Sequence, residues 1–170
     1  MIASAAAVRL AAAQVPPLDE WVSSLGDADY QATSRAHVAL GRRPEGGVLT
    51  VEHFPGVVVL NRHLRVNASP DRLVMVSPRS TAYVLGLLPV ALSVTWRMEA
   101  SRDGDRVDVA GTLEVALRRR AHELAARLVG LRRLLAAHAR EELDGFAADM
   151  ARKASPAPEP ACPAAAGARA

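Results

Sequence analysis

The sequence is poor in cysteine and in aromatic residues. Cys162 is the only cysteine among 170 residues, and Phe, Trp and Tyr together make up 4%. One thiol excludes a disulfide framework and a zinc site built on cysteines. The sequence also lacks a glycine-rich phosphate loop, a Gly-x-Ser-x-Gly elbow and a cysteine nucleophile motif, which argues against nucleotide use and against serine or cysteine hydrolysis.

The excess of positive charge is small. The 21 basic and 18 acidic side chains give a net charge of +3, a weak field for a chain of this size. We therefore expect no nucleic-acid partner, although the isoelectric point is near 9.7. Only one basic residue is lysine, Lys153, and 34 residues are alanine, a bias typical of GC-rich bacterial coding.

No apolar run is suited to crossing a membrane. The longest uncharged run, residues 80–96, contains Gly86 and Pro89 and is shorter than the roughly 20 residues of a membrane helix. Residues 1–14 are apolar, but no basic residue precedes the run and Arg9 lies inside it, unlike a signal peptide. These features predict a cytoplasmic protein without a membrane span.

The composition divides the chain into three parts. We expect residues 1–15 to be an N-terminal tail or frayed helix and residues 16–153 to fold as one ligand-binding domain. Residues 154–170 are rich in Pro and Ala and predict a disordered tail, since they offer nothing to bury. Half of all residues are hydrophobic, which is enough for a core in the middle part.

Alternating patterns predict an antiparallel sheet. Apolar residues alternate with polar ones from Val90 to Glu99 and from Val107 to Val115. The intervening Asp103-Gly104 is a strong hairpin signal. A short helix should follow Pro16-Pro17 and run to about Leu25. The expected strands cover residues 30–40, 48–54, 57–66, 72–76, 90–99 and 107–115.

A long C-terminal helix should cover this sheet. Residues 118–153 contain no proline and are rich in Ala, Leu, Arg and Glu, which favour helix. Gly130 and Gly145 are candidate bends. Apolar residues recur at helical spacing at Leu124, Leu128, Leu131, Leu135, Phe146 and Met150. The predicted fold is α+β, with about six antiparallel strands wrapped on one long helix.

This pattern resembles the START-like, helix-grip (SRPBCC) superfamily of polyketide cyclases and small-ligand carriers. Residues 69–74, Ser-Pro-Asp-Arg-Leu-Val, resemble its P-x-R-L step, and residues 94–107 resemble its T-W-x-x-E…D-G-x-x-V hairpin. The resemblance implies an apolar cavity between sheet and helix that holds a small hydrophobic, aromatic or polyketide-like molecule. It departs at the N-terminus, where the family has a strand and two helices.

Two polar residues interrupt the apolar stripe of the predicted helix. Steps of three and four residues from Leu135 reach His138, Glu142 and then Phe146. Burying an unpaired carboxylate costs several kcal/mol, so Glu142 needs a cation, a wet cavity or a metal. In the structural alternative, Glu142 pairs with Arg97 or another strand arginine, and His138 is a hydrogen-bonded residue at the rim of the helix face.

The spacing His-x-x-x-Glu can also present an imidazole and a carboxylate to one ion. Residues 138–143, His-Ala-Arg-Glu-Glu-Leu, resemble the C-terminal helix of the diacetylphloroglucinol hydrolases, zinc-dependent carbon–carbon hydrolases of the helix-grip fold. That resemblance implies His138 and Glu142 as metal ligands. Further ligands would come from the strands, where the available residues are His37, Glu52, His53 and His63.

Three functional hypotheses follow. The first is a ligand-binding or polyketide cyclase-like (aromatase-like) protein without a cofactor, in which His138 and Glu142 move protons. In this hypothesis the ligand contacts would be Tyr83, Trp96, Arg97 and Met98, although Tyr83, Trp96 and Met98 could equally pack the core. The second is a zinc hydrolase using His138 and Glu142. The third is a non-catalytic interaction module, which could form a homodimer.

Overall fold

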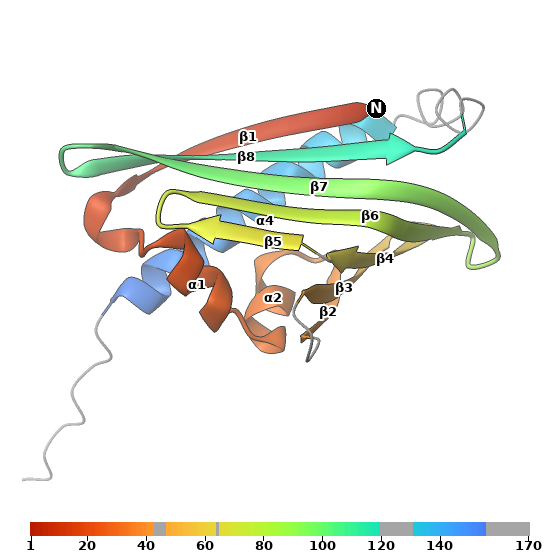
Figure 1. Ribbon diagram of the computed structural model, residues 1–170, viewed down its shortest axis with the longest axis horizontal. Coiled ribbons are helices and arrows are strands. Elements are labelled where there is room, and N and C mark those ends of the chain that lie inside the picture. The colour runs from red at the N-terminus through yellow and green to blue at the C-terminus, as the bar shows by residue number, and fades with distance from the viewer. Residues whose placement is uncertain (43–46, 64, 120–130, 156–170) are drawn as a thin grey trace, which may run out of the picture.

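The computed structural model describes residues 1–42, 47–63, 65–119 and 131–155. In this part of the chain an antiparallel sheet wraps around a long helix (Figure 1). The strands are β1 (Ile2–Ala11), β2 (His37–Arg42), β3 (Val48–Phe54), β4 (Val57–His63), β5 (Arg65–Ser69), β6 (Arg72–Val84), β7 (Leu88–Asp103) and β8 (Arg106–Leu117). The helices are α1 (Leu18–Ser24), α2 (Asp27–Thr33) and α4 (Leu131–Ala154), with a short 3-10 turn at Ala12–Gln14.

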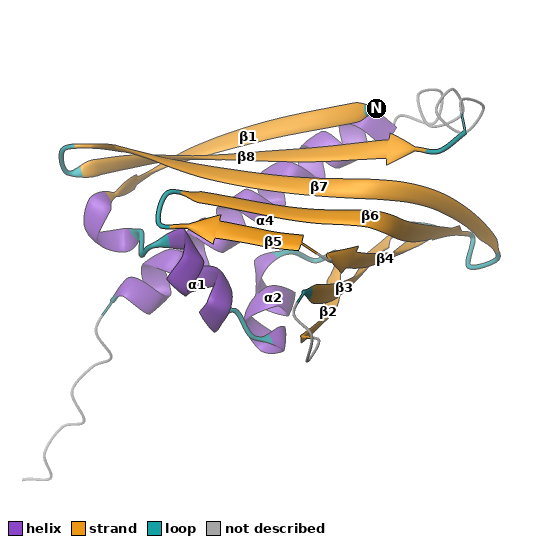
Figure 2. Cartoon of the chain, viewed as in Figure 1, coloured by secondary structure: helices purple, strands orange, loops and turns teal. Residues whose placement is uncertain are grey.

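The strand order is β1-β8-β7-β6-β4-β3-β2, with β5 beside β6. The helices α1, α2 and α4 lie on one side of this curved sheet (Figure 2). The predicted α+β class, with an antiparallel sheet and a C-terminal helix, is confirmed. The sheet has eight strands rather than about six, because β1 is added and the predicted strand 57–66 is divided into β4 and β5.

The N-terminal segment is a strand, so the prediction of a tail or frayed helix at residues 1–15 is wrong. β1 pairs with β8 over its whole length, from Ile2 opposite Val115 to Ala11 opposite Arg106. Its residues alternate between exposed and more buried positions, and the exposed Arg9 guanidinium binds Asp108 at 2.7 Å. Alanines give little apolar contrast, so the pairing with β8 is what fixes this conformation.

Residues 30–33, predicted as the start of a strand, are instead the second half of helix α2, which spans Asp27–Thr33. The carboxylate of Asp29 accepts the backbone N–H of Gly26 at 3.1 Å, and Asp27 adds a second acid to the first turn. Both favour a helix N-terminus. The predicted helix ending near Leu25 is confirmed as α1. A strand and two helices thus open the fold, so the predicted departure from the family plan at the N-terminus is wrong.

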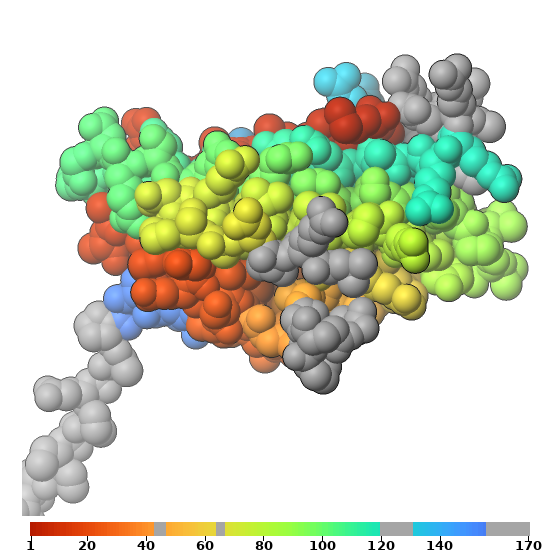
Figure 3. Space-filling view, in the orientation of Figure 1, coloured from red at the N-terminus to blue at the C-terminus, as the bar shows by residue number. Residues whose placement is uncertain are grey.

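The core lies between the sheet and α4. Trp96 of β7 stacks near Phe146 of α4, with ring centroids 6.1 Å apart, and Met98 and Leu143 are fully buried beside them. Gly111 of β8 leaves room for the indole, since a Cβ there would lie 2.2 Å from the Trp96 ring. In the space-filling view the strands hide most of α4 (Figure 3).

Part of the predicted C-terminal helix and tail lies outside the described residues. This part comprises the helix over residues 120–130 with Leu124, Leu128 and the bend at Gly130, and residues 156–170 of the tail with Cys162. Within the described residues, α4 runs from Leu131 to Ala154. None of the described helices combines the length and the apolarity that a membrane span requires.

A buried hydrogen bond joins α1 to the end of α4. The indole Nε1 of Trp21 donates to Oδ2 of Asp149 at 2.9 Å, and the Trp21 ring packs edge-on against Phe146. Trp21→Phe keeps the ring contact and removes the donor, so we expect a loss of about 1.5 kcal/mol of unfolding free energy, measured in urea. Ser23→Ala, on the exposed side of α1, is the control, and equal effects of both variants would contradict this role.

Candidate functional site

Four ionisable side chains meet between α4 and the β2–β3 hairpin. His37 and Glu52 are cross-strand partners, so they point to the same face of the sheet. His138 and Glu142 lie one turn apart on the face of α4 turned toward them. The Nε2 of His37 is 3.4 Å from Oε1 of Glu142, and the Nε2 of His138 is 3.7 Å from Glu52 Oε2 and 3.8 Å from Glu142 Oε2.

The two carboxylates in this cluster have no arginine or lysine partner among the described residues. His37, His138 and Glu142 are only 6%, 4% and 5% exposed. Glu142 does not pair with Arg97, as one alternative predicted, because Arg97 lies on the opposite face of β7 and binds Glu114 at 3.3 Å. The negative charge of the cluster is therefore balanced only by imidazoles, or by a cation that the four side chains hold together.

The ring of His37 is held by its Nδ1. This atom lies 2.9 Å from the carbonyl oxygen of Tyr30 and 2.9 Å from the hydroxyl of Thr33, and the ring stacks on Tyr30. In the neutral ring, Nδ1–H donates to this carbonyl and Nε2 carries the lone pair. That Nε2 is buried and makes no hydrogen bond, which is the arrangement of a metal-ligating histidine with its backbone support.

Glu52 is held through one of its oxygens. Its Oε1 accepts hydrogen bonds from Asn61 Nδ2 at 2.7 Å, Tyr30 Oη at 3.3 Å and Thr50 Oγ1 at 3.5 Å. Oε2 is left to face His138. Sequence reasoning missed Asn61 and Thr50 as parts of the site, although both are polar residues on buried strand positions.

A chain of hydrogen bonds holds the side-chain carbonyl of Asn61 on the side away from Glu52. Ser80 Oγ lies 2.8 Å from Asn61 Oδ1 and 2.8 Å from Ser77 Oγ, and Ser77 Oγ accepts the backbone N–H of Arg62 at 2.7 Å. Each hydroxyl has one proton to donate. Asn61 Oδ1 can only accept, so it takes the single proton of the Ser80 hydroxyl, and Ser77, which accepts from the Arg62 amide, donates its own proton to Ser80. The amide of Asn61 then presents its N–H to Glu52, which favours a negative charge there.

The burial of the cluster also changes its ionisation. Burial, and next the charge of Glu142, raise the pKa of Glu52. Burial alone would lower the pKa of His37, but the close carboxylate of Glu142 and the charge of Glu52 outweigh it, so that pKa is raised. Burial raises the pKa of Tyr30 well above its usual value. The Tyr30 hydroxyl therefore stays protonated and remains a donor to Glu52.

The spacing of the donor atoms suits a tetrahedral ion better than direct hydrogen bonds. One nitrogen or oxygen from each of His37, His138 and Glu142 lies within 4.8 Å of the others. Zinc–nitrogen and zinc–oxygen bonds of about 2.0–2.2 Å place neighbouring ligand atoms about 3.3–3.6 Å apart in a tetrahedron. The gaps of 3.4 Å from His37 to Oε1 and 3.8 Å from His138 to Oε2 of Glu142 are closer to that spacing than to the roughly 2.9 Å of good N–H···O bonds.

An open groove of about 300 Å³ leads from the surface to His138. Its walls include Phe54 and Leu134. Arg35 and Glu141 also line it, and the backbone N–H of Arg35 donates to Oε1 of Glu141 at 2.8 Å. The Phe54 ring packs edge-on against His138, with centroids 4.8 Å apart. A ligand in this groove would have an apolar wall on one side and would meet the ionisable cluster at His138, the member of the cluster that lines the groove.

The remaining predicted site residues are scattered. Trp96 and Met98 face α4 and fill the core. Tyr83 pairs with Pro89, on the same outer face as Arg97, so neither can contact a ligand held between sheet and helix, and that prediction is wrong for these two residues. Among the further ligand candidates, His53 is exposed and lines the groove.

His63 is buried but does not reach the cluster directly. Its Nε2 lies 3.5 Å from Thr50 Oγ1, and its Nδ1 has no hydrogen-bond partner. Burial lowers its pKa to about 4, so the ring is neutral around pH 7. The structure thus brings together His37, Glu52, His138 and Glu142, and leaves His53 and His63 outside.

Comparison with solved structures identifies the architecture. A conserved protein from Geobacillus kaustophilus superposes with a TM-score of 0.56 at 7% identity, covering 90% of this chain and 97% of that one. TTHA0849 from Thermus thermophilus gives 0.55 at 14% identity, covering 90% and 99%. The di-domain ARO/CYC StfQ from the steffimycin biosynthetic pathway gives 0.53 at 14% identity, covering 90% of this chain and 52% of that one.

The chain has the START-like, helix-grip fold. No family model matches the sequence, and no curated protein matches it. At identities of 7–14% the likeness concerns the fold alone, and fold does not fix function. The chemistry of this helix-grip protein must therefore be argued from the cluster around Glu142.

Proposed function

We propose that this helix-grip protein is a zinc-dependent hydrolase whose ion is held by His37, His138 and Glu142. The observation that carries the proposal is the buried Nε2 of His37, which has no hydrogen bond and points to Glu142 at 3.4 Å. A buried lone pair beside an unneutralised carboxylate is costly. A divalent ion shared by both groups removes the cost for each.

The donor set suits zinc. Two imidazole nitrogens and one carboxylate form the His₂Glu set of many catalytic zinc sites, in which three protein ligands leave a position for water or substrate. When bound, such an ion polarises a carbonyl oxygen or lowers the pKa of a coordinated water. The ligands come from β2 and α4, two elements packed in the same core, so their relative positions are fixed.

Glu52 is the group that we expect to hold or move a proton. Asn61, Tyr30 and Thr50 bind its Oε1, so the free Oε2 stays beside His138. The groove that ends at His138 supplies Phe54 and Leu134 as apolar walls. We infer a small substrate with an apolar or aromatic, polyketide-like body and a carbonyl group, consistent with carbon–carbon bond hydrolysis.

The ligand-carrier or cyclase-like alternative depends on a closed apolar cavity between sheet and helix. In the described residues that space holds Trp96, Phe146, Met98 and Leu143, and the grooves beside His138 and over β6 and β7 are both open. Apolar side chains fill this space, and Glu52 and Glu142 have no arginine or lysine partner among the described residues. Both observations support the hydrolase over the carrier.

Elemental analysis tests the proposal. Protein purified without chelators, or refilled with zinc and desalted, is expected to hold stoichiometric zinc. His37→Ala, His138→Ala and Glu142→Ala should lose it while keeping the far-ultraviolet circular dichroism of the fold. His53→Ala, in the groove but outside the cluster, is the matched control and should keep the ion. Wild-type protein that takes up no zinc would overturn the proposal.

Glu52→Gln separates catalysis from binding. We expect this variant to retain zinc and to lose hydrolysis of aromatic β-diketones by at least about a hundredfold, because the free oxygen no longer accepts a proton. Loss of zinc in Glu52→Gln would instead make Glu52 a fourth ligand. The site would then be closed, as structural zinc sites are, and the hydrolase would be rejected.

A further inference from the structure

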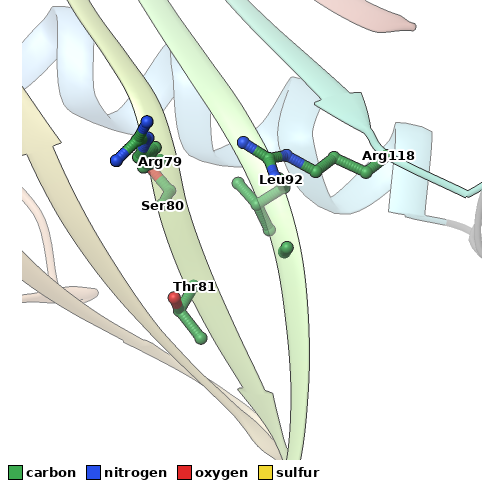
Figure 4. A pocket seen from close by; sticks show the side chains of 6 residues that line it. Arg79, Ser80, Thr81, Leu92 and Arg118 are labelled. Carbon is green, nitrogen blue, oxygen red and sulfur yellow. The ribbon is translucent and has the colours of Figure 1, made fainter.

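A second groove, of about 310 Å³, is formed over β6, β7 and the end of β8 (Figure 4). The residues that line it are Arg79, Ser80, Thr81, Ala91, Leu92 and Arg118. Figure 4 shows the side chain of Arg118 extending from the end of β8 over β7 toward the β6 side, where Arg79 lies. Two guanidinium groups thus border one hollow.

Strand register explains the hollow. Thr81 is opposite Ala91, and the backbone N–H of Arg118 donates to the carbonyl of Ala91 at 3.4 Å. These three residues therefore lie side by side on the outer face of the sheet. Ala91 has only a methyl group, so the space between its long neighbours stays open. The irregularity of β6 between Ser77 and Ser80 brings Arg79 to the rim.

The charge at this place is unbalanced. Four other arginines of the sheet each pair with a carboxylate: Arg9 with Asp108, Arg72 with Glu99, Arg97 with Glu114 and Arg102 with Asp71. Arg79 and Arg118 have no acidic partner among the residues that the structure describes. Two neighbouring positive charges without a counter-charge attract an anion from solution.

We propose that this groove binds a phosphate group, carried by a small phosphorylated molecule or by a phospholipid headgroup. Guanidinium groups bind phosphate with two parallel N–H···O bonds, and the charge of a phosphate monoester, about −1.5 to −2 at pH 7, matches two arginines. The Thr81 hydroxyl is a further donor at the wall. The proposal does not depend on the zinc site, which lies on the opposite face of the sheet.

Binding of inorganic phosphate and of vesicles tests the proposal. Isothermal titration with phosphate in chloride buffer, and co-sedimentation with phosphatidylcholine vesicles with and without phosphatidic acid, are compared for four proteins. Arg79→Gln and Arg118→Gln should each weaken binding at least about tenfold, the loss expected for a hydrogen bond to a charged group. Arg72→Gln is the control, because it removes the same charge from the same face of β6.

Each outcome decides the question. Phosphate binding that both variants weaken and the control retains supports a small-molecule ligand, whether or not vesicles bind. Phosphatidic acid-dependent sedimentation without phosphate binding, with the same pattern among the variants, assigns the groove to a headgroup. An absence of binding in both arms, or an equal loss in Arg72→Gln, overturns the proposal, since the latter would reflect the general charge of the surface.

Discussion

Gly145→Ala should destabilise the protein by about 3 kcal/mol or more. Gly145 is the point where α4 touches the end of α2, and a Cβ there would lie 1.9 Å from the carbonyl oxygen of Thr33 and 2.6 Å from its Cα. Backbone atoms cannot move aside as a flexible side chain can, so the two helices must separate. Because α2 leads into His37, the candidate zinc site should be disturbed as well.

The sign of this effect is diagnostic. In an ordinary helix interior, glycine to alanine stabilises by about 1 kcal/mol, so intrinsic propensity predicts the opposite result. Urea unfolding at neutral pH measures the difference. Asp144→Ala, at the preceding exposed position of α4, is the control and should change the stability by less than about 0.5 kcal/mol. A stabilised Gly145→Ala would show that α2 and α4 do not meet at this distance.

Acid should weaken the fold through His63. Burial lowers the pKa of this imidazole from 6.5 to about 4, so the folded state resists protonation that the unfolded chain accepts. The unfolding free energy is therefore unaffected by His63 above about pH 6.5, and it decreases as the pH falls from there toward 4. By linkage, a shift of this size removes about 2 kcal/mol between pH 7 and pH 4.5.

A leucine at this position should remove that loss. His63→Leu cannot take up a proton, so the difference in unfolding free energy between pH 7 and pH 4.5 should be about 2 kcal/mol smaller than in the wild type. His53→Leu, on the exposed side of the adjacent strand, is the control variant for the same substitution. If His63→Leu and the wild type show the same dependence, then His63 is not held neutral by burial.

Sequence periodicity was sufficient to find the half of the site that lies on α4. His138 and Glu142 interrupt an apolar stripe at helical spacing, and this interruption can be recognised from the sequence alone. His37 and Glu52 were candidates together with His53 and His63, and only the strand register separates them. Glu52 faces α4 while its neighbour His53 faces solvent, a parity that the sequence of β3 alone does not determine.

Other parts required three-dimensional information. Asn61, Ser77 and Ser80 act together only because β6 is irregular between residues 77 and 80, which no local signal marked. β1 was missed because an alanine-rich strand resembles a helix in composition, and its partner β8 lies far along the chain. By contrast, the β7–β8 hairpin was predicted correctly, since both strands and their Asp-Gly turn are local.

The pairing of β1 with β8 has a consequence for the synthesis of the chain. Ile2 lies opposite Val115, so β1 leaves the ribosome well before its partner β8 has been made. At about 5–20 residues per second this delay is on the order of ten seconds, during which the edges of β1 are unpaired. Closing so distant a contact is slow. We expect the sheet to be completed only once β8 has been made, with the pairing of β1 as a late step of folding.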